Sequence, residues 1–188
     1  MLFQQGNDMT TKPHILLLTG TPGIGKTTVL RQVAEGLGNK RIGGFYTAEL
    51  REQGVRRGFR LVGFDGSQGI IAHVDLPQQQ RVGKYGVDVA TLDRLAETTL
   101  AFPSDRTAYL VDEIGKMECL SPCFVAAMGT LLAADIPLVA TVGKKGGGFI
   151  DEVKQRRDVE LWEVTHANRD ALPAEILNWL SRHGVSPG

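Results

Sequence analysis

Several features that would mark particular classes of protein are scarce in this sequence. Lys and Arg together number 21 and so do Asp and Glu, so the formal net charge is zero. This balance argues against a protein that mainly coats nucleic acid, and nucleic acid is not an expected partner. No apolar run approaches the length of a membrane span. Residues 1–12 lack the basic start and apolar core of a signal peptide, so we expect a cytoplasmic protein with a loose N-terminal tail.

Cysteine and aromatic residues are also few. The two cysteines, Cys119 and Cys123, stand near the start of an expected helix. A zinc site would need two further ligands, and disulfides are unusual in the cytosol. We therefore interpret both as small apolar residues. Only 6% of the residues are aromatic, so no stacking platform for a nucleotide base is evident.

The sequence after the N-terminal tail predicts one α/β domain, which we place at residues 13–188. Short apolar runs at 15–18, 108–111 and 137–142 are typical of buried parallel strands. Helices are expected at 27–34, 89–100, 122–134, 151–157 and 173–182. Because strands and helices alternate, the fold class should be α/β, with a mostly parallel sheet flanked by helices.

The pattern changes between residues 42 and 74. Segments 42–50, 55–64 and 69–74 have strand character, and 55–64 alternates polar and apolar residues. Asp65-Gly66 opens a turn between the second and third of these segments. We predict an antiparallel meander appended to the parallel sheet.

Residues 20–27 match the phosphate-binding pattern G-x-x-x-x-G-K-[ST] at every fixed position. A strand-like run precedes them and a helix-compatible segment follows, which is the setting of a P-loop. Glycines let backbone N–H groups turn toward phosphate oxygens, and a helix N-terminus adds further donors. Lys26 should reach the β- and γ-phosphates, and Thr27 should ligate Mg²⁺. The predicted nucleotide-binding residues here are Gly20, Thr21, Pro22, Gly23, Ile24, Gly25, Lys26, Thr27 and Thr28.

Two acids, Asp112 and Glu113, follow the apolar run at 108–111. We predict that Asp112 holds Mg²⁺, directly or through water, and that Glu113 is the general base that activates a water molecule. Two solvated acids at a strand end are the alternative, which the upstream P-loop disfavours.

Phosphoryl transfer also needs positive charge near the transferred group. The candidates are Lys116, Lys144, Lys145, Arg156 and Arg157. Glycines 146–148 precede the two arginines and suit a mobile lid, so either arginine could act as a catalytic finger; a solvated basic face is the alternative. Thr141, at a predicted strand tip, either senses the γ-phosphate or is simply a β-branched strand residue.

Ligands in open parallel sheets bind beyond the carboxyl ends of the strands. The loop at 165–170 follows the last predicted strand, at residues 161–165, and His166 or Asn168 is a candidate to contact the base. Helix capping by Asn168 or Asp170 is the alternative.

Together these motifs resemble the small cancer-related nucleoside-triphosphatase family of P-loop proteins. The matching segments are 20–28, 44–47 with Glu49 and Arg51, 58–59, 82–87, 112–118 and 163–170. The resemblance implies a RecA-like fold. It also implies slow, Mg²⁺-dependent hydrolysis of ATP, GTP and other nucleoside triphosphates to diphosphate and phosphate, with broad base selectivity. It supports the roles of Lys26, Thr27, Asp112 and Glu113. A monomer is expected.

Two other functions are open at this point. A nucleotide or small-molecule kinase would use the same loop with an acceptor pocket, built from residues 56–60 with Asp65 or from residues 144–157. The acid at Glu113 favours water as the acceptor instead. A nucleotide-dependent binding module is the third possibility, and the zero net charge weakens an RNA-associated one.

Overall fold

The parallel half of the molecule forms where the apolar runs predict it. The structure is a computed structural model and describes residues 13–38, 41–77 and 79–186; the tail expected at 1–12 lies outside the described residues. The parallel strands are β1 (Ile15–Thr19), β2 (Ile42–Glu52), β7 (Ala108–Ile114), β8 (Leu138–Val142) and β9 (Val159–Glu163). They pair in the order β2-β7-β8-β1-β9, so the strand that precedes the P-loop lies between two others.

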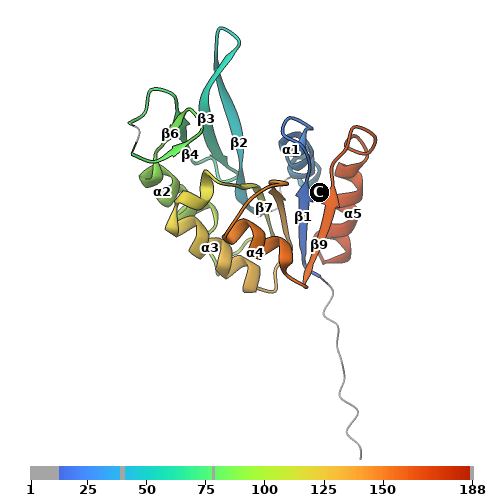
Figure 1. Cartoon of the computed structure of the whole chain (residues 1–188). Coiled ribbons are helices and arrows are strands. Elements are labelled where there is room, and N and C mark those ends of the chain that lie inside the picture. Colours follow the sequence, from blue (N-terminus) through green and yellow to red (C-terminus); the bar gives the residue numbers. More distant parts are fainter. Residues whose placement is uncertain (1–12, 39–40, 78, 187–188) are drawn as a thin grey trace, which may run out of the picture.

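Helices cover both faces of this sheet, as predicted. They are α1 (Lys26–Leu37), α2 (Val89–Thr99), α3 (Pro122–Ala133), α4 (Phe149–Gln155) and α5 (Leu172–Arg182). Helices α1 and α5 pack together on one face, and α2, α3 and α4 lie on the other (Figure 1). Strand β1 shows why its run is wholly apolar: Ile15 and Leu17 enter one core cluster, and Leu16 and Leu18 enter the other.

The antiparallel part extends the same sheet. Strands β3 (Val55–Gly63), β4 (Gln68–His73), β5 (Arg81–Val82) and β6 (Tyr85–Val87) continue it beyond β2, giving a 9-stranded sheet within the described residues. Strand β2 belongs to both parts, because residues 42–45 pair in parallel with β7 and residues 45–52 pair with β3. The β2–β3 hairpin projects from the sheet (Figure 1). The predicted α/β fold with an appended meander is confirmed.

Two details differ from the predictions. The glycine-flanked segment at 82–87, expected as a loop, contributes the small β5–β6 hairpin. Cys119 lies in a 3₁₀ turn, η1 (Glu118–Leu120), before α3, and Cys123 lies in α3 itself. Both are free thiols and half-buried. In the part of the chain that the structure describes, no helix is long and apolar enough to cross a membrane.

Candidate active site

The P-loop connects β1 to α1 at the edge where the parallel strands end. Gly23 and Gly25 have φ angles of 78° and 112°, in the left-handed region that glycine adopts most easily. A side chain at Gly20 would come within 2.9 Å of the Val164 carbonyl oxygen, so this position is also restricted. Helix α1 begins at Lys26, and its first N–H groups have no intrahelical partners. The loop therefore has the backbone shape and the free donors of a phosphate site.

The side chains of the loop divide between the site and the core. Lys26 is 9% exposed, and its Nζ lies 3.2 Å from the Gly20 carbonyl oxygen. Thr27 is half-buried, and its hydroxyl has no hydrogen-bond partner among the described residues. Ile24 is buried in the core cluster under α1, so only its backbone can face a nucleotide. Thr28 is exposed.

Asp112, at the end of β7, is the most buried acid of the site, with 1% of its surface exposed. One carboxylate oxygen accepts hydrogen bonds from the Thr47 backbone N–H (3.3 Å) and hydroxyl (3.1 Å). The other accepts the Thr141 hydroxyl at 2.8 Å. Thr141 is a fully buried residue of β8, as the strand interpretation of the sequence expected, and its hydroxyl also orients Asp112. Thr47, on β2, is a site residue that sequence reasoning missed.

Glu113 lines a cavity next to Lys26. Side chains at Gly115 or Gly143 would come within 3.3 and 3.4 Å of its Oε1, so both glycines leave room for this carboxylate. Burial raises the pKa of Glu113; the positive charge of Lys26 opposes this shift and the negative charge of Asp112 adds to it. The Asp112–Glu113 peptide bond is cis.

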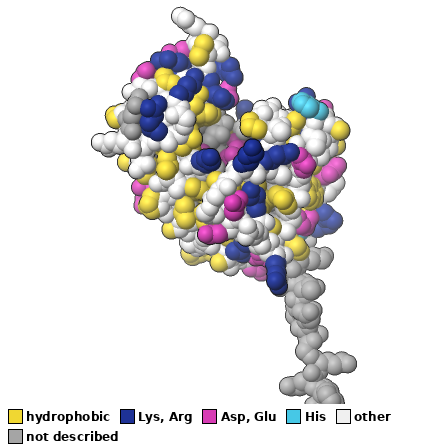
Figure 2. All heavy atoms as spheres, in the orientation of Figure 1, with side chains coloured by type: hydrophobic (Ala, Val, Ile, Leu, Met, Phe, Trp, Pro, Cys, Tyr) yellow, Lys and Arg dark blue, Asp and Glu magenta, His cyan; other side chains and the backbone are white. Residues whose placement is uncertain are grey.

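The cavity has a volume of about 720 Å³, within the range of small-molecule sites. Its wall comes from the start of the P-loop, the segment after β7, the segment after β8, and the appended sheet. The lining residues are Gly20, Thr21, Pro22, Lys26, Thr47, Phe59, Val82, Glu113, Gly115, Lys116, Met117, Glu118, Gly143, Lys144, Lys145 and Ile150. In the space-filling view the molecule is notched between the hairpin side and the α1–α5 side, and Lys and Arg side chains follow the notch (Figure 2).

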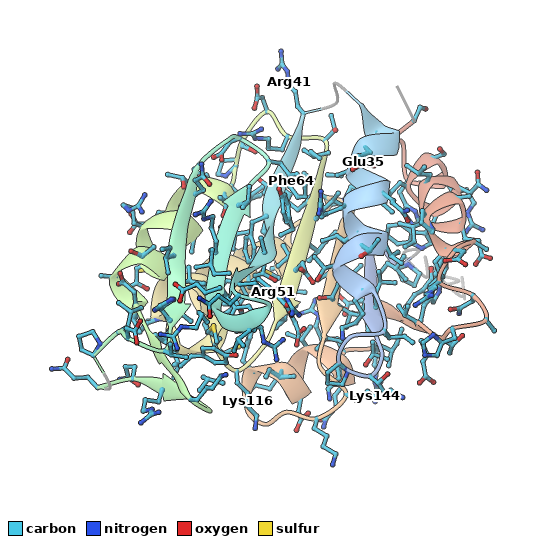
Figure 3. All side chains as sticks on the ribbon, turned by 90° about the horizontal axis from the view of Figure 1, so that it is seen from above. Glu35, Arg41, Arg51, Phe64, Lys116 and Lys144 are labelled. Atoms are coloured by element: carbon cyan, nitrogen blue, oxygen red, sulfur yellow. The ribbon has the colours of Figure 1, made fainter. Side chains whose placement is uncertain are left out.

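The predicted cations separate into two groups. Lys116, Lys144 and Lys145 line the cavity, and the view from above shows Lys116 and Lys144 on the same side of the molecule, away from Arg41 (Figure 3). Arg156 points elsewhere: its guanidinium donates to the Leu132 carbonyl at 2.7 Å and to Asp158 at 2.9 Å.

Arg157 is exposed, and neither it nor Arg156 is part of the cavity wall. The sequence could not show that Arg156 is held away from the cavity, because the Leu132 carbonyl that binds it belongs to a different helix. In this conformation the structure does not bring the two predicted finger residues to the cavity.

The loop after β9 is built around Asn168. Its Oδ1 accepts from the Thr165 N–H at 2.8 Å, and its Nδ2 donates to the Glu163 carbonyl at 2.8 Å. The amide therefore closes its own loop, and His166 beside it is exposed. Arg169, to which the sequence assigned no role, lies against the P-loop with Nη1 3.5 Å from the Ile24 carbonyl.

Glu118 is a second acid in the cavity wall that sequence reasoning did not single out as a site residue. It is 6% exposed, and burial raises its pKa to about 8. Hydrogen bonds from the backbone of Glu118 and Gly115 oppose this rise, and the charges of Glu113 and Asp112 add to it. An uncharged carboxylic acid therefore lies close to the proposed base at neutral pH.

The residues present suit Mg²⁺ in the manner of nucleotide sites. No three His, Cys, Asp or Glu side chains converge on a metal site among the residues described. Mg²⁺ bound with a nucleotide needs only one or two protein oxygens, because phosphates and water supply the rest. The unpartnered Thr27 hydroxyl and the oriented Asp112 carboxylate are oxygen donors of the appropriate kind.

Known proteins resemble this chain along most of its length. A family model described as NTPase matches residues 15–177. The chain is 41% identical over 167 residues to the nucleoside-triphosphatase THEP1 of Thermotoga sp. (strain RQ2), covering 88% of this chain and 94% of that protein. It is 36% identical over 179 residues to the cancer-related nucleoside-triphosphatase homolog of Mus musculus, with 86% and 94% covered.

Two solved structures share the architecture. The crystal structure of THEP1 from the hyperthermophile Aquifex aeolicus matches with a TM-score of 0.80 and 32% identity, over 89% of this chain and 99% of that one. The solution structure of a human cancer-related nucleoside triphosphatase matches with a TM-score of 0.75 and 33% identity, over 89% and 97%. The appended antiparallel strands lie within residues 15–177, the span of the matched family model.

Proposed function

The chain belongs to the nucleoside-triphosphatase family that includes THEP1 and the cancer-related nucleoside-triphosphatases, and from this we propose that it hydrolyses nucleoside triphosphates in a Mg²⁺-dependent reaction. The substrates are ATP, GTP and other nucleoside triphosphates, and the products are the diphosphate and phosphate. The observation that carries the proposal is the pair Asp112–Glu113, in which one acid is buried and hydrogen-bonded and its neighbour lines the cavity beside Lys26.

Each acid has a separate task in this reaction. The oxygen of a water molecule attacks the γ-phosphorus, the Glu113 carboxylate takes the proton, and the bond between the γ-phosphorus and the bridging oxygen breaks. Lys26 exchanges its contact with the Gly20 carbonyl for phosphate oxygens. Bound Mg²⁺ supplies further positive charge there, and Thr27 and Asp112 would hold it, Asp112 directly or through water.

Low turnover is expected because the positive charges near the reacting phosphate do not include an arginine finger. Within the described residues the cavity is lined by lysines and by no arginine, and Arg156 is bound to Asp158 and to the Leu132 carbonyl. An arginine finger increases the rate of phosphoryl transfer by about a thousandfold or more. Without one, we expect slow intrinsic hydrolysis.

Broad base selectivity is supported by the loop after β9. The Asn168 amide is used within its own loop, and the exposed His166 has no partner to fix its orientation among the described residues. A base bound beside this loop would meet few directed hydrogen bonds. Selectivity between bases depends on such contacts, because a site that lacks them rejects analogues weakly.

Of the two acceptor pockets that the sequence suggested for a kinase, residues 144–157 contribute Lys144, Lys145 and Ile150 to the cavity wall. The charged side chains of the other, residues 56–60 with Asp65, lie outside it. Arg56 pairs with Glu49, and Arg57 pairs with Asp75. Asp65 accepts from the Ser67 hydroxyl inside its own turn. These side chains are occupied at the surface of the appended sheet and are not part of the cavity wall.

Phosphate release from ATP, GTP, CTP and UTP with Mg²⁺, without any added acceptor, tests the proposal. Glu113→Gln should retain nucleotide binding and lose about 100-fold or more in kcat, since general-base catalysis supplies roughly that factor. Glu152→Gln, at an exposed position on α4, is the matched control. Release no faster than that of a Lys26→Ala variant would refute hydrolysis, and phosphate transfer to an added nucleoside would favour a kinase.

A further inference from the structure

The cavity contains more than a phosphate site requires. One part of its wall is polar and includes Lys26, Thr47 and Glu113. The other part is apolar, and its side chains come from segments far apart in the sequence. They are Phe59 on β3, Val82 on β5, Met117 after β7 and Ile150 on α4. Phosphate groups gain nothing from an apolar wall, so this part has to be explained in another way.

The cavity does not extend to the residues that we propose lie beside the base. Its wall includes Gly20, Thr21 and Pro22 from the first half of the P-loop, but not Gly23, Gly25 or Thr28 from the second. The proposed base-side residues His166 and Asn168 are also absent from the wall. Since Lys26 and Glu113 act at the terminal phosphate, the apolar part lies beyond that phosphate, on the side away from the base.

The mouth of the cavity is basic. Lys116 and Lys145 are exposed at the wall, and neither has a charged partner among the described residues. Lys144, which also lines the cavity, is paired with Glu163. Two unpaired ammonium groups beside an apolar wall favour an anionic ligand with an apolar body.

Phe59 is held in place for such a contact. Its ring packs edge-to-face against Tyr85, with 5.1 Å between ring centroids, and it remains half-buried on the cavity side. Thr47 is on β2, next to the strand that carries Phe59, and its hydroxyl holds Asp112. The appended sheet therefore provides both an apolar surface for a ligand and a contact to the catalytic centre.

We propose that the apolar part of this cavity is a second binding site, for a small organic anion with an aromatic or aliphatic body, next to the γ-phosphate position. The carboxylate or comparable group of the ligand meets Lys116 and Lys145, and its apolar body contacts Phe59, Val82, Met117 and Ile150. The position relative to the phosphate rests on the proposed function, whereas the binding of the anion does not.

Methyl NMR on the full chain labelled with [¹³C-methyl]methionine tests the site directly. Met117 lines the cavity and Met128 is fully buried in the core, so their methyl groups are a probe and an internal control. Titration with naphthalene-2-carboxylate should shift the Met117 signal saturably and leave Met128 in place. The uncharged 2-naphthylmethanol should bind about threefold to tenfold more weakly, because it forms no ion pairs.

Two variants test the two halves of the recognition. Lys116→Gln combined with Lys145→Gln should reduce carboxylate affinity to that of the alcohol, whereas Arg182→Gln, at an exposed position of α5, should change nothing. Phe59→Ala should weaken both probes about tenfold, and its melting temperature shows whether the fold persists. The lysine variants are at exposed positions, so the test remains decisive if Phe59→Ala unfolds.

Three results would overturn the proposal. If neither probe shifts the Met117 signal saturably, the proposed site does not exist. Equal affinity of the acid and the alcohol would show that the site does not prefer an anionic ligand. Complete displacement of naphthalene-2-carboxylate by saturating ADP and Mg²⁺ would show that the cavity serves the nucleotide alone. A normal Met117 titration in a protein that fails to release phosphate from ATP would count against the proposed hydrolysis and not against this site.

Discussion

Thr141 donates its hydroxyl hydrogen bond to Asp112 across 2.8 Å, and the two side chains are 0% and 1% exposed. The second carboxylate oxygen of Asp112 is held by Thr47. Asp112 is therefore fixed from β8 on one side and from β2 on the other. A buried acid supported in this way keeps one orientation, which is what a site for a small divalent cation requires.

Thr141→Val removes one of these supports with little change of shape. The buried Asp112 oxygen would lose its partner, so we expect unfolding to become easier by about 1–3 kcal/mol and the Mg²⁺ needed for half-maximal hydrolysis to rise. Urea unfolding and a Mg²⁺ titration of phosphate release measure the two effects. Thr130→Val, at an exposed position on α3, is the control. An unchanged Mg²⁺ requirement would mean that Asp112 needs no orientation from Thr141.

Glu118→Gln should change how stability depends on pH. The pKa of Glu118 is about 8 in the folded protein and near 4.5 for an ordinary glutamate, so the folded state binds the extra proton between these values. Stability is therefore lost as pH rises through this window, by up to about 1.4 kcal/mol per pH unit. Glutamine has no proton to lose.

The variant should thus gain stability relative to the natural protein as pH rises from 5 to 8.5. Urea unfolding at several pH values measures the difference, and Glu152→Gln at an exposed site supplies the baseline. A difference that does not vary with pH would contradict a protonated Glu118.

Arg156→Ala distinguishes a structural arginine from a catalytic finger. The guanidinium holds Asp158 and the Leu132 carbonyl, so we expect a loss of about 1–3 kcal/mol in stability. The kcat for hydrolysis should fall by less than about tenfold, whereas loss of a finger would reduce it about a thousandfold or more. Asp158→Asn should reproduce part of the stability loss. A thousandfold fall in kcat with Arg156→Ala alone would show that Arg156 is a catalytic arginine finger.

His166→Ala and Asn168→Ala should behave differently. The His166 side chain is exposed, so its removal should leave the ratio of kcat/KM between ATP and GTP within about twofold. Asn168→Ala opens the loop that passes beside the P-loop, so KM should rise for all nucleotides alike. Steady-state kinetics with both nucleotides decide this. A change in the ATP to GTP ratio in either variant would identify a base contact.

The sequence by itself determined the architecture and the centre of the site. Buried parallel strands need continuous apolar runs, and a P-loop needs glycines at fixed spacing, so both appear as local patterns. Residues 15–18 and 20–27 therefore predict a buried strand and the phosphate-binding loop that follows it. Asp112 and Glu113 come directly after the apolar run at 108–111 and lie in the last part of β7, near the edge of the sheet where the parallel strands end.

Tertiary structure decided which side chains surround that centre. Thr47 reaches Asp112 across 65 positions of sequence, and Arg156 is held by the Leu132 carbonyl 24 positions away. The apolar part of the cavity unites Phe59 with Ile150, which belong to different layers of the molecule. Such contacts depend on how the appended sheet and the helices pack, and packing is a property of the whole fold with no local pattern to predict it.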